Sequence, residues 1–240
     1  GGANGFAKAL AKVIKATPVV TTATDVNKLF AVDEWAARNN MIINGMKAAK
    51  DFAAALVDGQ EVGLFTDYPI ISALPRQIVL KDKGVTGLAI TKNRNVKPFD
   101  LTVQLWPRNI YLGIGCRRGT TLESIETLVL PKLKELGIDL RTIVGVASVD
   151  LKKDEAGLLN FAAKYNWEIS FFTAEELQNA AGEFSSSDFV KSVVGVSNVC
   201  ERSAVLAANN GSIISSKCSL NGVTLAVAEA DIVLDFEKLS

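Results

Sequence analysis

The stretch IYLGIGCRRGTTLESIETLVLPKLKELGIDLRTIVGVASVDLKKDEAGLLNFAAKYNWEISFF, residues 110–172, decides the fold class. Short runs rich in Ile, Val and Gly alternate with longer segments whose apolar side chains recur every three or four residues. This alternation is typical of a parallel sheet whose strands are connected by helices. It predicts strands at residues 110–115, 142–149 and 167–172 and helices at residues 121–136 and 155–165. Thr120 with Glu123, and Thr173 with Glu176, have the spacing of capping boxes at two helix starts.

On both sides of this stretch the pattern changes. Before it, residues 61–106 contain short β-like runs separated by Pro, Gly, Asn and Asp, which predicts a small domain with a mixed or antiparallel sheet. A helix at residues 44–57 precedes these runs, and another helix after Asp25 is expected to kink near Asn39 and Asn40. After the stretch, helices near residues 187–193 and 198–209 and strands at residues 212–216 and 223–228 complete the chain.

The composition excludes several classes of protein. The 240 residues carry 26 basic and 26 acidic side chains, so there is no overall positive field, and nucleic-acid binding is not expected. No apolar run is long enough for a membrane span and no signal peptide is recognisable. Three cysteines without a CxxC spacing indicate reduced thiols in the cytoplasm. The absence of histidine excludes Ser-His-Asp chemistry and His-ligated metals within this sequence, and no metal site is expected.

The turn after the strand at residues 110–115 is the first candidate site. Its glycines and cations precede a helix whose N-terminal N–H groups attract anions, and guanidinium groups bind carboxylates in a bidentate manner. An anion-binding turn and an ordinary Gly-rich turn with solvated arginines are equally compatible with the residues alone. The candidate residues are Gly115, Cys116, Arg117, Arg118, Gly119 and Thr120.

The loop after the strand at residues 142–149 is the second candidate site, because it concentrates charge at a strand end. Asp150, Lys152 and Glu155 are the candidates for proton transfer there, since a lysine beside carboxylates can act as an acid or a base when it is partly buried. A solvated helix N-terminus explains the same residues, and the local pattern alone favours that explanation.

Isolated polar residues elsewhere have structural explanations of their own. Thr22, Thr24 and Asp25 follow a short strand and suit either a polar ligand or an N-cap. Ser187 is typical of an N-cap, and Lys217 of an edge strand that is protected by its charge. Near Glu201, Cys200 is expected to be a small core residue.

Several motifs, in order along the whole chain, resemble the CbiG family of cobalamin biosynthesis, the cobalt-precorrin-5A hydrolases of the anaerobic pathway. Each motif is weak alone, and their common order is specific. The motifs are GGAN at residues 1–4, PVVTTATD at 18–25, LGIGCRRGTT at 112–121, SVDLKKDEAGL at 148–158, SSSDFV at 185–190, VGVSNVCERSAVLAA at 194–208, Lys217, and GVT at 222–224.

The resemblance implies a multidomain α/β protein. Residues 1–45 are then the second half of an N-terminal α/β domain, residues 46–107 a small mixed-sheet middle domain, and residues 108–240 a C-terminal parallel or mixed α/β sandwich shared with the CobE proteins. Family members usually carry a further N-terminal segment, with a His just before the Gly-Gly pair. Because this sequence starts at Gly1 without an initiator Met, we expect it to be part of a longer protein.

The resemblance also implies a reaction. The family opens a δ-lactone on a cobalt-bound tetrapyrrole and releases acetaldehyde, and the cobalt arrives with the substrate, so no separate cofactor is expected. Such chemistry needs a base, an acid and donors for an oxyanion. Proton transfer is assigned to Asp150, Lys152 and Glu155, with Glu201 opposite, and the turn at residues 116–120 is the candidate oxyanion or carboxylate site.

Recognition of the macrocycle is expected from cations and from a wide cleft. Its acetate and propionate side chains suit Arg117, Arg118 and Lys217, and the cleft is expected between domains, with the threonines at residues 21–24 and Ser187 contributing. No nucleic-acid or membrane partner is expected, and a homodimer is considered as the assembly.

Two alternatives remain open. A nucleotide-dependent α/β enzyme would place a pyrophosphate on Gly113, Gly115 and Gly119 and a ribose on Asp150, although the spacing between Gly119 and Asp150 is longer than usual. A non-catalytic corrinoid-binding protein would keep the cations and need none of the proton-transfer groups.

Overall fold

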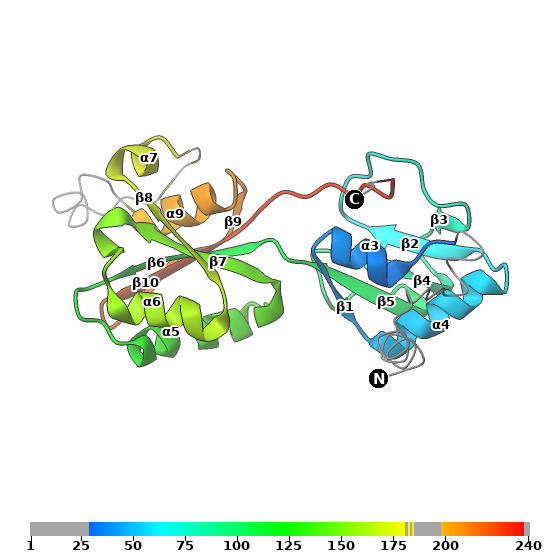
Figure 1. Ribbon diagram of the computed structural model, residues 1–240, viewed down its shortest axis with the longest axis horizontal. Helices are drawn as coiled ribbons and strands as arrows, with labels where there is room; N and C mark the ends of the chain where they lie inside the picture. The colour runs from blue at the N-terminus through cyan, green and yellow to red at the C-terminus, as the bar shows by residue number, and fades with distance from the viewer. Residues whose placement is uncertain (1–28, 181, 183, 185–197, 238–240) are drawn as a thin grey trace, which may run out of the picture.

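The computed structural model describes residues 29–180, 182, 184 and 198–237, which form two lobes joined at a narrow waist (Figure 1). We call residues 29–107 together with 231–237 the first lobe, and the described residues between 109 and 230 the second lobe. The elements of the first lobe are α3 (Val32–Arg38), β1 (Met41–Asn44), α4 (Met46–Val57), β2 (Val62–Thr66), β3 (Ile78–Leu80), β4 (Gly84–Ile90) and β5 (Phe99–Pro107).

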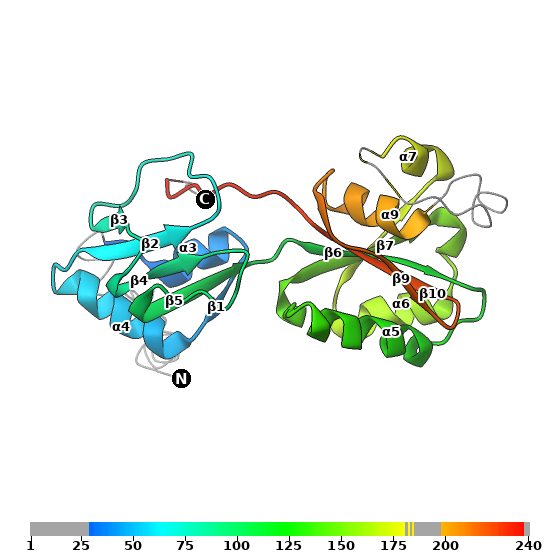
Figure 2. The ribbon, with the colours of Figure 1, turned by 180° about the vertical axis from the view of Figure 1, so that it is seen from behind.

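The first lobe is built on a mixed five-stranded sheet in the order β1-β5-β4-β2-β3. The strands β5, β4, β2 and β3 are parallel to their neighbours, and β1 is antiparallel to β5. Alternate residues of β2, β4 and β5 share one core with α3 and α4, so both helices cover the same face (Figure 2). The predicted small mixed sheet is therefore present.

The strand β1 differs from the sequence-based expectation of a helix kinked near Asn39 and Asn40. The helix α3 ends at Arg38, and Asn40 has a φ of 52°, a left-handed conformation that turns the chain into a strand. Residues 41–44 then pair with residues 104–107 of β5. Residues 41–44, which were assigned to an N-terminal domain, thus share a sheet with strands of residues 46–107.

The second lobe begins directly after β5. Its elements are β6 (Ile110–Cys116), α5 (Leu122–Glu135), η1 (Leu140–Thr142), β7 (Ile143–Val149), η2 (Asp150–Lys152), α6 (Ala156–Tyr165), β8 (Glu168–Phe172), α7 (Ala174–Gln178), α9 (Val199–Ala207), β9 (Ser212–Leu220) and β10 (Val223–Glu229).

The sheet of the second lobe has the order β8-β7-β6-β10-β9. The strands β6, β7 and β8 are parallel, which confirms the prediction that residues 110–115 and 142–149 form neighbouring parallel strands. The strand β10 is antiparallel to β6 and to β9, so the sheet is mixed. Helices α5 and α6 cover one face, and α7 and α9 cover the other (Figures 1 and 2).

The helix caps match the sequence at one site and differ at the other. Thr173 and Glu176 form the predicted capping box. At α5 the cap is Thr121, whose hydroxyl accepts a hydrogen bond from the backbone N–H of Ser124, so the predicted box of Thr120 with Glu123 is wrong by one residue. Among the described residues, no helix combines the length and the apolar character needed to cross a membrane.

The chain crosses between the lobes twice. After β10, residues 231–237 return to the first lobe, where Leu234 is fully buried and forms a parallel bridge with Ile70. The indole N–H of Trp35 donates to the carbonyl oxygen of Asp235 at 2.9 Å, and the ring of Phe236 stacks on Trp35 with a centroid separation of 4.6 Å. The predicted C-terminal domain, residues 108–240, therefore contributes its last described residues to the first lobe.

Candidate functional site

The turn between β6 and α5 is tight and is held by its own hydrogen bonds. The carbonyl oxygen of Arg117 accepts from the backbone N–H of Thr120 at 3.3 Å and from its hydroxyl at 2.7 Å. Gly119 has a φ of 74°, a conformation that a side chain disfavours. These contacts place the backbone N–H groups of the turn at the start of α5, as the anion-site hypothesis requires.

The carboxylate of Glu155 fills part of this site. The backbone N–H of Gly119 donates to Oε1 of Glu155 at 2.8 Å, and the Glu155 residue is only 5% exposed. The other oxygen, Oε2, is buried, makes no hydrogen bond within the described part of the chain and lies 3.7 Å from Nζ of Lys152. Glu155 therefore connects the two predicted loops and supplies an internal anion to the turn.

The start of α6 is packed tightly against the same turn. A Cβ on Gly157 would overlap the carbonyl oxygen of Thr120, so only glycine allows this approach. Lys152 and Glu155 face the turn, since Glu155 accepts from the backbone N–H of Gly119 and Lys152 lies beside Glu155. Asp150 is half-buried at the start of η2.

Cys116 completes this cluster, which we call the turn cluster: Cys116, Gly119, Thr120, Lys152 and Glu155. Burial raises the pKa of the Cys116 thiol, and the ammonium group of Lys152 opposes that rise. The carboxylate of Glu155 raises the pKa further, whereas a hydrogen bond with Thr120 lowers it. The thiol is thus protonated near neutral pH and is not prepared as a nucleophile.

The two arginines of the turn point to different neighbours. Nη1 of Arg118 donates to Oδ2 of Asp154 at 2.9 Å in an exposed ion pair. Arg117 is exposed, and its aliphatic part lies over Gly222 in the β9–β10 turn, where a Cβ would lie 2.9 Å from its Cδ. The two guanidinium groups therefore do not form a single clamp.

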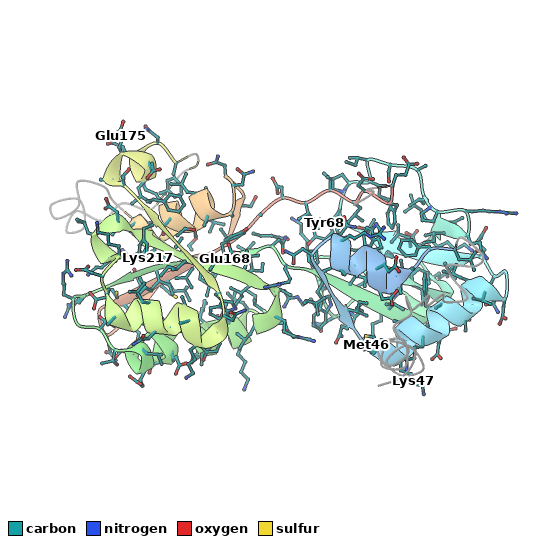
Figure 3. The ribbon with its side chains drawn as sticks, in the orientation of Figure 1. Met46, Lys47, Tyr68, Glu168, Glu175 and Lys217 are labelled. Atoms are coloured by element: carbon teal, nitrogen blue, oxygen red, sulfur yellow. The ribbon has the colours of Figure 1, made fainter. Side chains whose placement is uncertain are left out.

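Glu201 lies in the first turn of α9. It is 4% exposed, and its Oε1 accepts from the backbone N–H of Lys217 at 2.7 Å while Oε2 accepts from the amide of Asn198. The helix α9 covers the sheet face opposite to α5 and α6, so Glu201 and the loop with Lys152 and Glu155 belong to different faces of the sheet, and a shared role for them stays a prediction. Lys217 lies on the edge strand β9 of the second lobe (Figure 3).

The start of α9 is positioned by close packing on β6. A Cβ on Gly113 would overlap the carbonyl oxygen of Cys200. Cys200 is 2% exposed, and burial raises the pKa of its thiol to about 11. It is the core residue that the sequence indicated. Thr22, Thr24, Asp25 and Ser187 lie outside the described residues.

The turn cluster is far from the first lobe, and the threonines at residues 21–24, which were expected to line a cleft with it, lie outside the described residues. The strand β6 starts at Ile110, beside the waist, and ends at Cys116, six residues further, which places the turn about 20 Å away. The two views agree that this turn is at the end of the second lobe remote from the first lobe (Figures 1 and 2). The waist cannot supply a wall to the turn cluster.

Sequence reasoning missed a polar network at the waist. The phenol of Tyr68 donates to Oε1 of Glu229 at 3.0 Å, and the amide of Asn109 donates to the same oxygen at 3.1 Å. Nζ of Lys92 lies 3.6 Å from Oε2 of Glu229. The signal was available, because Lys92 follows one of the β-like runs of residues 61–106, now β4, and ligands gather at the carboxyl ends of parallel strands.

The network and the turn cluster contain no metal site within the part of the chain that the structure describes. The described residues contain no group of three or more His, Cys, Asp or Glu side chains arranged to hold a metal ion.

Two family models match the two lobes. The model for the cobalamin biosynthesis central region matches residues 30–107, and the model for the cobalamin synthesis G C-terminus matches residues 110–228. These ranges agree with the lobes as the structure shows them, apart from the returning residues 231–237. The comparisons give no support to a nucleotide-dependent enzyme.

Two similar proteins are both named cobalt-precorrin-5A hydrolase. The chain is 32% identical to cobalt-precorrin-5A hydrolase of Salmonella typhimurium strain LT2 over 243 residues, with 96% of this chain and 69% of that protein covered. It is 28% identical to cobalt-precorrin-5A hydrolase of Priestia megaterium, with 95% of this chain and 66% of that protein covered. The chain thus spans about two thirds of the length of these relatives.

Solved structures of similar proteins include that of CobE, a protein from the cobalamin (vitamin B12) biosynthetic pathway. The similarity covers 50% of this chain and 89% of that chain, with 28% sequence identity and a TM-score of 0.48. The order of the motifs, the two matching family models and the 32% identity along nearly the whole sequence lead to the same conclusion. The chain belongs to the cobalt-precorrin-5A hydrolase family of cobalamin biosynthesis.

Proposed function

We propose that this chain acts in anaerobic cobalamin biosynthesis as a cobalt-precorrin-5A hydrolase, opening the δ-lactone and releasing acetaldehyde to give cobalt-precorrin-5B. The observation that carries this proposal is the 32% identity to a protein of that name along 96% of the chain. Because the chain spans about two thirds of the relatives' length, the whole activity is part of the proposal.

Within this function we assign proton transfer to the loop that starts at Asp150. Lys152 has a side chain that is 16% exposed, and its ammonium group lies 3.7 Å from Oε2 of Glu155 and close to the thiol of Cys116. Asp150 is half-buried on the same loop and is the candidate base for water attack. A lactone carbonyl held beside the turn cluster would face the ammonium group of Lys152, which can stabilise its oxyanion or act as the acid.

Glu155 and Glu201 receive positioning roles in this proposal. Glu155 is buried and bonded to Gly119, so its carboxylate is used to hold the turn and the ammonium group of Lys152. Glu201 is bonded to the backbone of Lys217 on the opposite face, where it fixes the edge strand. Neither carboxylate is assigned a contact with the substrate.

The proposal also covers substrate binding, partners and cellular location. Arg117, Arg118 and Lys217 are proposed to bind the carboxylate side chains of the tetrapyrrole substrate, with Thr22, Thr24, Asp25 and Ser187 as further contacts. The cobalt is part of the substrate, and we propose no further cofactor, no nucleic-acid partner and no membrane partner. A cytoplasmic location and a homodimer are proposed on the sequence alone.

The direct test is a turnover assay of the purified chain with cobalt-precorrin-5A, in which released acetaldehyde is measured by coupling to alcohol dehydrogenase. Lys152→Met should lower kcat about a hundredfold and leave the substrate bound, as expected for a positioned acid or base. Lys153→Met removes the neighbouring exposed cation and is the matched control, expected to retain activity. Substrate binding without acetaldehyde release by the unaltered chain would instead favour the corrinoid-binding alternative.

The positioning role of Glu155 needs a separate readout. Glu155→Gln should lower kcat with little change in KM and should shift the pH profile of kcat, because the charge that faces Lys152 is lost. Glu155→Asp keeps the charge and should recover part of the activity. If Glu155→Gln left both the pH profile and kcat unchanged, Glu155 would be structural only.

A further inference from the structure

A cavity of about 400 Å³ lies at the waist, between the two lobes. The first lobe contributes residues that follow β2 and β4, among them Tyr68 and Lys92, and the second lobe contributes Ile138 and Ile214. Tyr68 lies on the side of the first lobe that faces the second lobe (Figure 3). The cavity is therefore at the carboxyl ends of two parallel strands, where α/β sheets usually bind ligands.

One wall of this waist cavity is polar and cationic. The ammonium group of Lys92 is on a side chain that is 56% exposed, and its neighbours are Oε2 of Glu229 at 3.6 Å and the ring of Tyr68 at 5.9 Å. Arg94 adds a second positive charge. Its guanidinium group is fixed across the waist by bonds to the carbonyl oxygen of Gly137 at 3.2 Å and to the hydroxyl of Thr142 at 2.7 Å.

Lys92 is the movable cation of this wall. The phenol of Tyr68 and the amide of Asn109 both donate to Oε1 of Glu229, so that carboxylate is already shared among several donors. The carboxylate of Asp67 accepts from the backbone N–H of Lys92 at 3.1 Å, and Arg94 is held by its bonds across the waist. The ammonium group of Lys92, on a side chain that is 56% exposed, is therefore the positive charge that can move toward a ligand.

The opposite wall is apolar. It is formed by side chains of the second lobe, and two of them are partly open to solvent: Leu136 is 36% exposed and Ile214 is 40% exposed. Ile110 and Ile138 continue this wall. Apolar side chains exposed beside convergent polar groups in a cavity are typical of a small-molecule site.

We propose that the waist cavity binds a small aliphatic carboxylate, with the carboxylate paired to Lys92 and the hydrocarbon chain on Leu136, Ile138 and Ile214. A volume of about 400 Å³ is near the lower end of the range for small-molecule sites. It admits one short acid, or one carboxylate side chain of a larger ligand, and not a whole macrocycle. This site is separate from the turn cluster at the other end of β6.

Hexanoate is the probe, and isothermal titration calorimetry at neutral pH is the measurement. Hexanoate should bind the unaltered chain more tightly than hexan-1-ol, which has the same chain length without the charge, and more tightly than hexylammonium. Lys92→Met should weaken hexanoate binding at least tenfold, whereas Lys97→Met, which removes an exposed cation outside the cavity, should not change it.

Glu229→Gln should change the affinity for hexanoate in the opposite direction to Lys92→Met. The amide oxygen can still accept from Tyr68 and Asn109, and the negative charge that competes for Lys92 is gone, so hexanoate binding should become several-fold tighter. Melting curves of each variant show whether it is folded. The proposal is overturned if hexan-1-ol or hexylammonium binds as well as hexanoate, or if Lys92→Met has no effect in a folded variant.

The source of the carboxylate is distinguished by turnover with the tetrapyrrole substrate in the presence of hexanoate. If the cavity takes a side chain of the substrate, hexanoate raises KM without changing kcat. If it takes a free acid, hexanoate binds while KM for the tetrapyrrole stays the same. The calorimetric result stands whether or not the chain hydrolyses the substrate, so a failure here is distinct from a failure of the proposed function.

Discussion

Lys152 and Glu155 form a charged pair whose removal can be measured by a double-mutant cycle. Nζ of Lys152 and Oε2 of Glu155 are 3.7 Å apart, with exposed fractions of 16% and 5% for the two side chains. At an effective dielectric constant of 20, two unit charges at this distance attract by about 4.5 kcal/mol, most of which offsets the cost of removing them from water. Losing one partner leaves that cost uncompensated.

We therefore expect Lys152→Met and Glu155→Gln each to lower the free energy of unfolding by about 2 to 3 kcal/mol. The double variant should lose no more free energy of unfolding than either single variant, because no buried charge remains. The sum of the two single losses then exceeds the loss of the double variant by a coupling energy of about 2 kcal/mol. In melting temperature the single variants correspond to a decrease of roughly 4 to 10 °C for a chain of this size.

The assay is urea unfolding followed by circular dichroism and by the fluorescence of Trp167, whose ring belongs to the core of the second lobe. Trp35 and Trp106 are replaced by Phe in all samples, so the signal reports the second lobe alone. Lys153→Met should unfold like the parent protein. Strictly additive losses in the double variant would show that the two groups do not interact, and the structural basis of the proposed site would be refuted.

Three further predictions concern packing, pH and the returning residues. Gly113→Ala should destabilise the second lobe by at least about 3 kcal/mol in urea unfolding, because the new Cβ overlaps the carbonyl oxygen of Cys200 and displaces α9; a loss below about 1 kcal/mol would contradict this packing. Burial raises the pKa of Tyr165 to about 12, so the native state holds this proton more tightly than the unfolded state, and the resulting stability is complete below about pH 10 and is lost as the pH rises through 12. Absorbance titration of the phenolate checks this, and ionisation of all three tyrosines near pH 10 in the folded protein would refute it. Phe236→Ala should lower the free energy of unfolding of the first lobe by about 2 kcal/mol, since it removes the stacking on Trp35. The measurement is amide hydrogen exchange, whose rate should increase in the first lobe and not in the second.

The second lobe was largely predictable because its signals are local. The strands at residues 110–115 and 142–149 and the helix between them have clear periodicity, and a connection of that length favours parallel neighbours. The strand β1 was not predictable, because four residues have no resolvable period and their partner, β5, lies some 60 residues away in sequence. The return of residues 231–237 also depends on distant contacts.

The proximity of the two candidate loops was predictable, and the contacts between them were not. The loop with Asp150, Lys152 and Glu155 and the turn at residues 116–120 both follow parallel strands of one sheet, and the structure brings them into contact. No local pattern could show that the Glu155 carboxylate would bind the backbone of Gly119, or that Glu201 would lie on the other face of the sheet. Both depend on which face of a strand or helix a residue occupies after folding.

The double crossing at the waist has a consequence for the order of folding during synthesis. The second lobe is continuous in sequence, whereas the first lobe is interrupted, with its fully buried Leu234 supplied after more than a hundred intervening residues. As the chain leaves the ribosome, the second lobe can acquire its complete core while the first lobe still lacks part of its own. The first lobe is therefore synthesised first but completes its core last, and the waist is complete only when residues 231–237 dock.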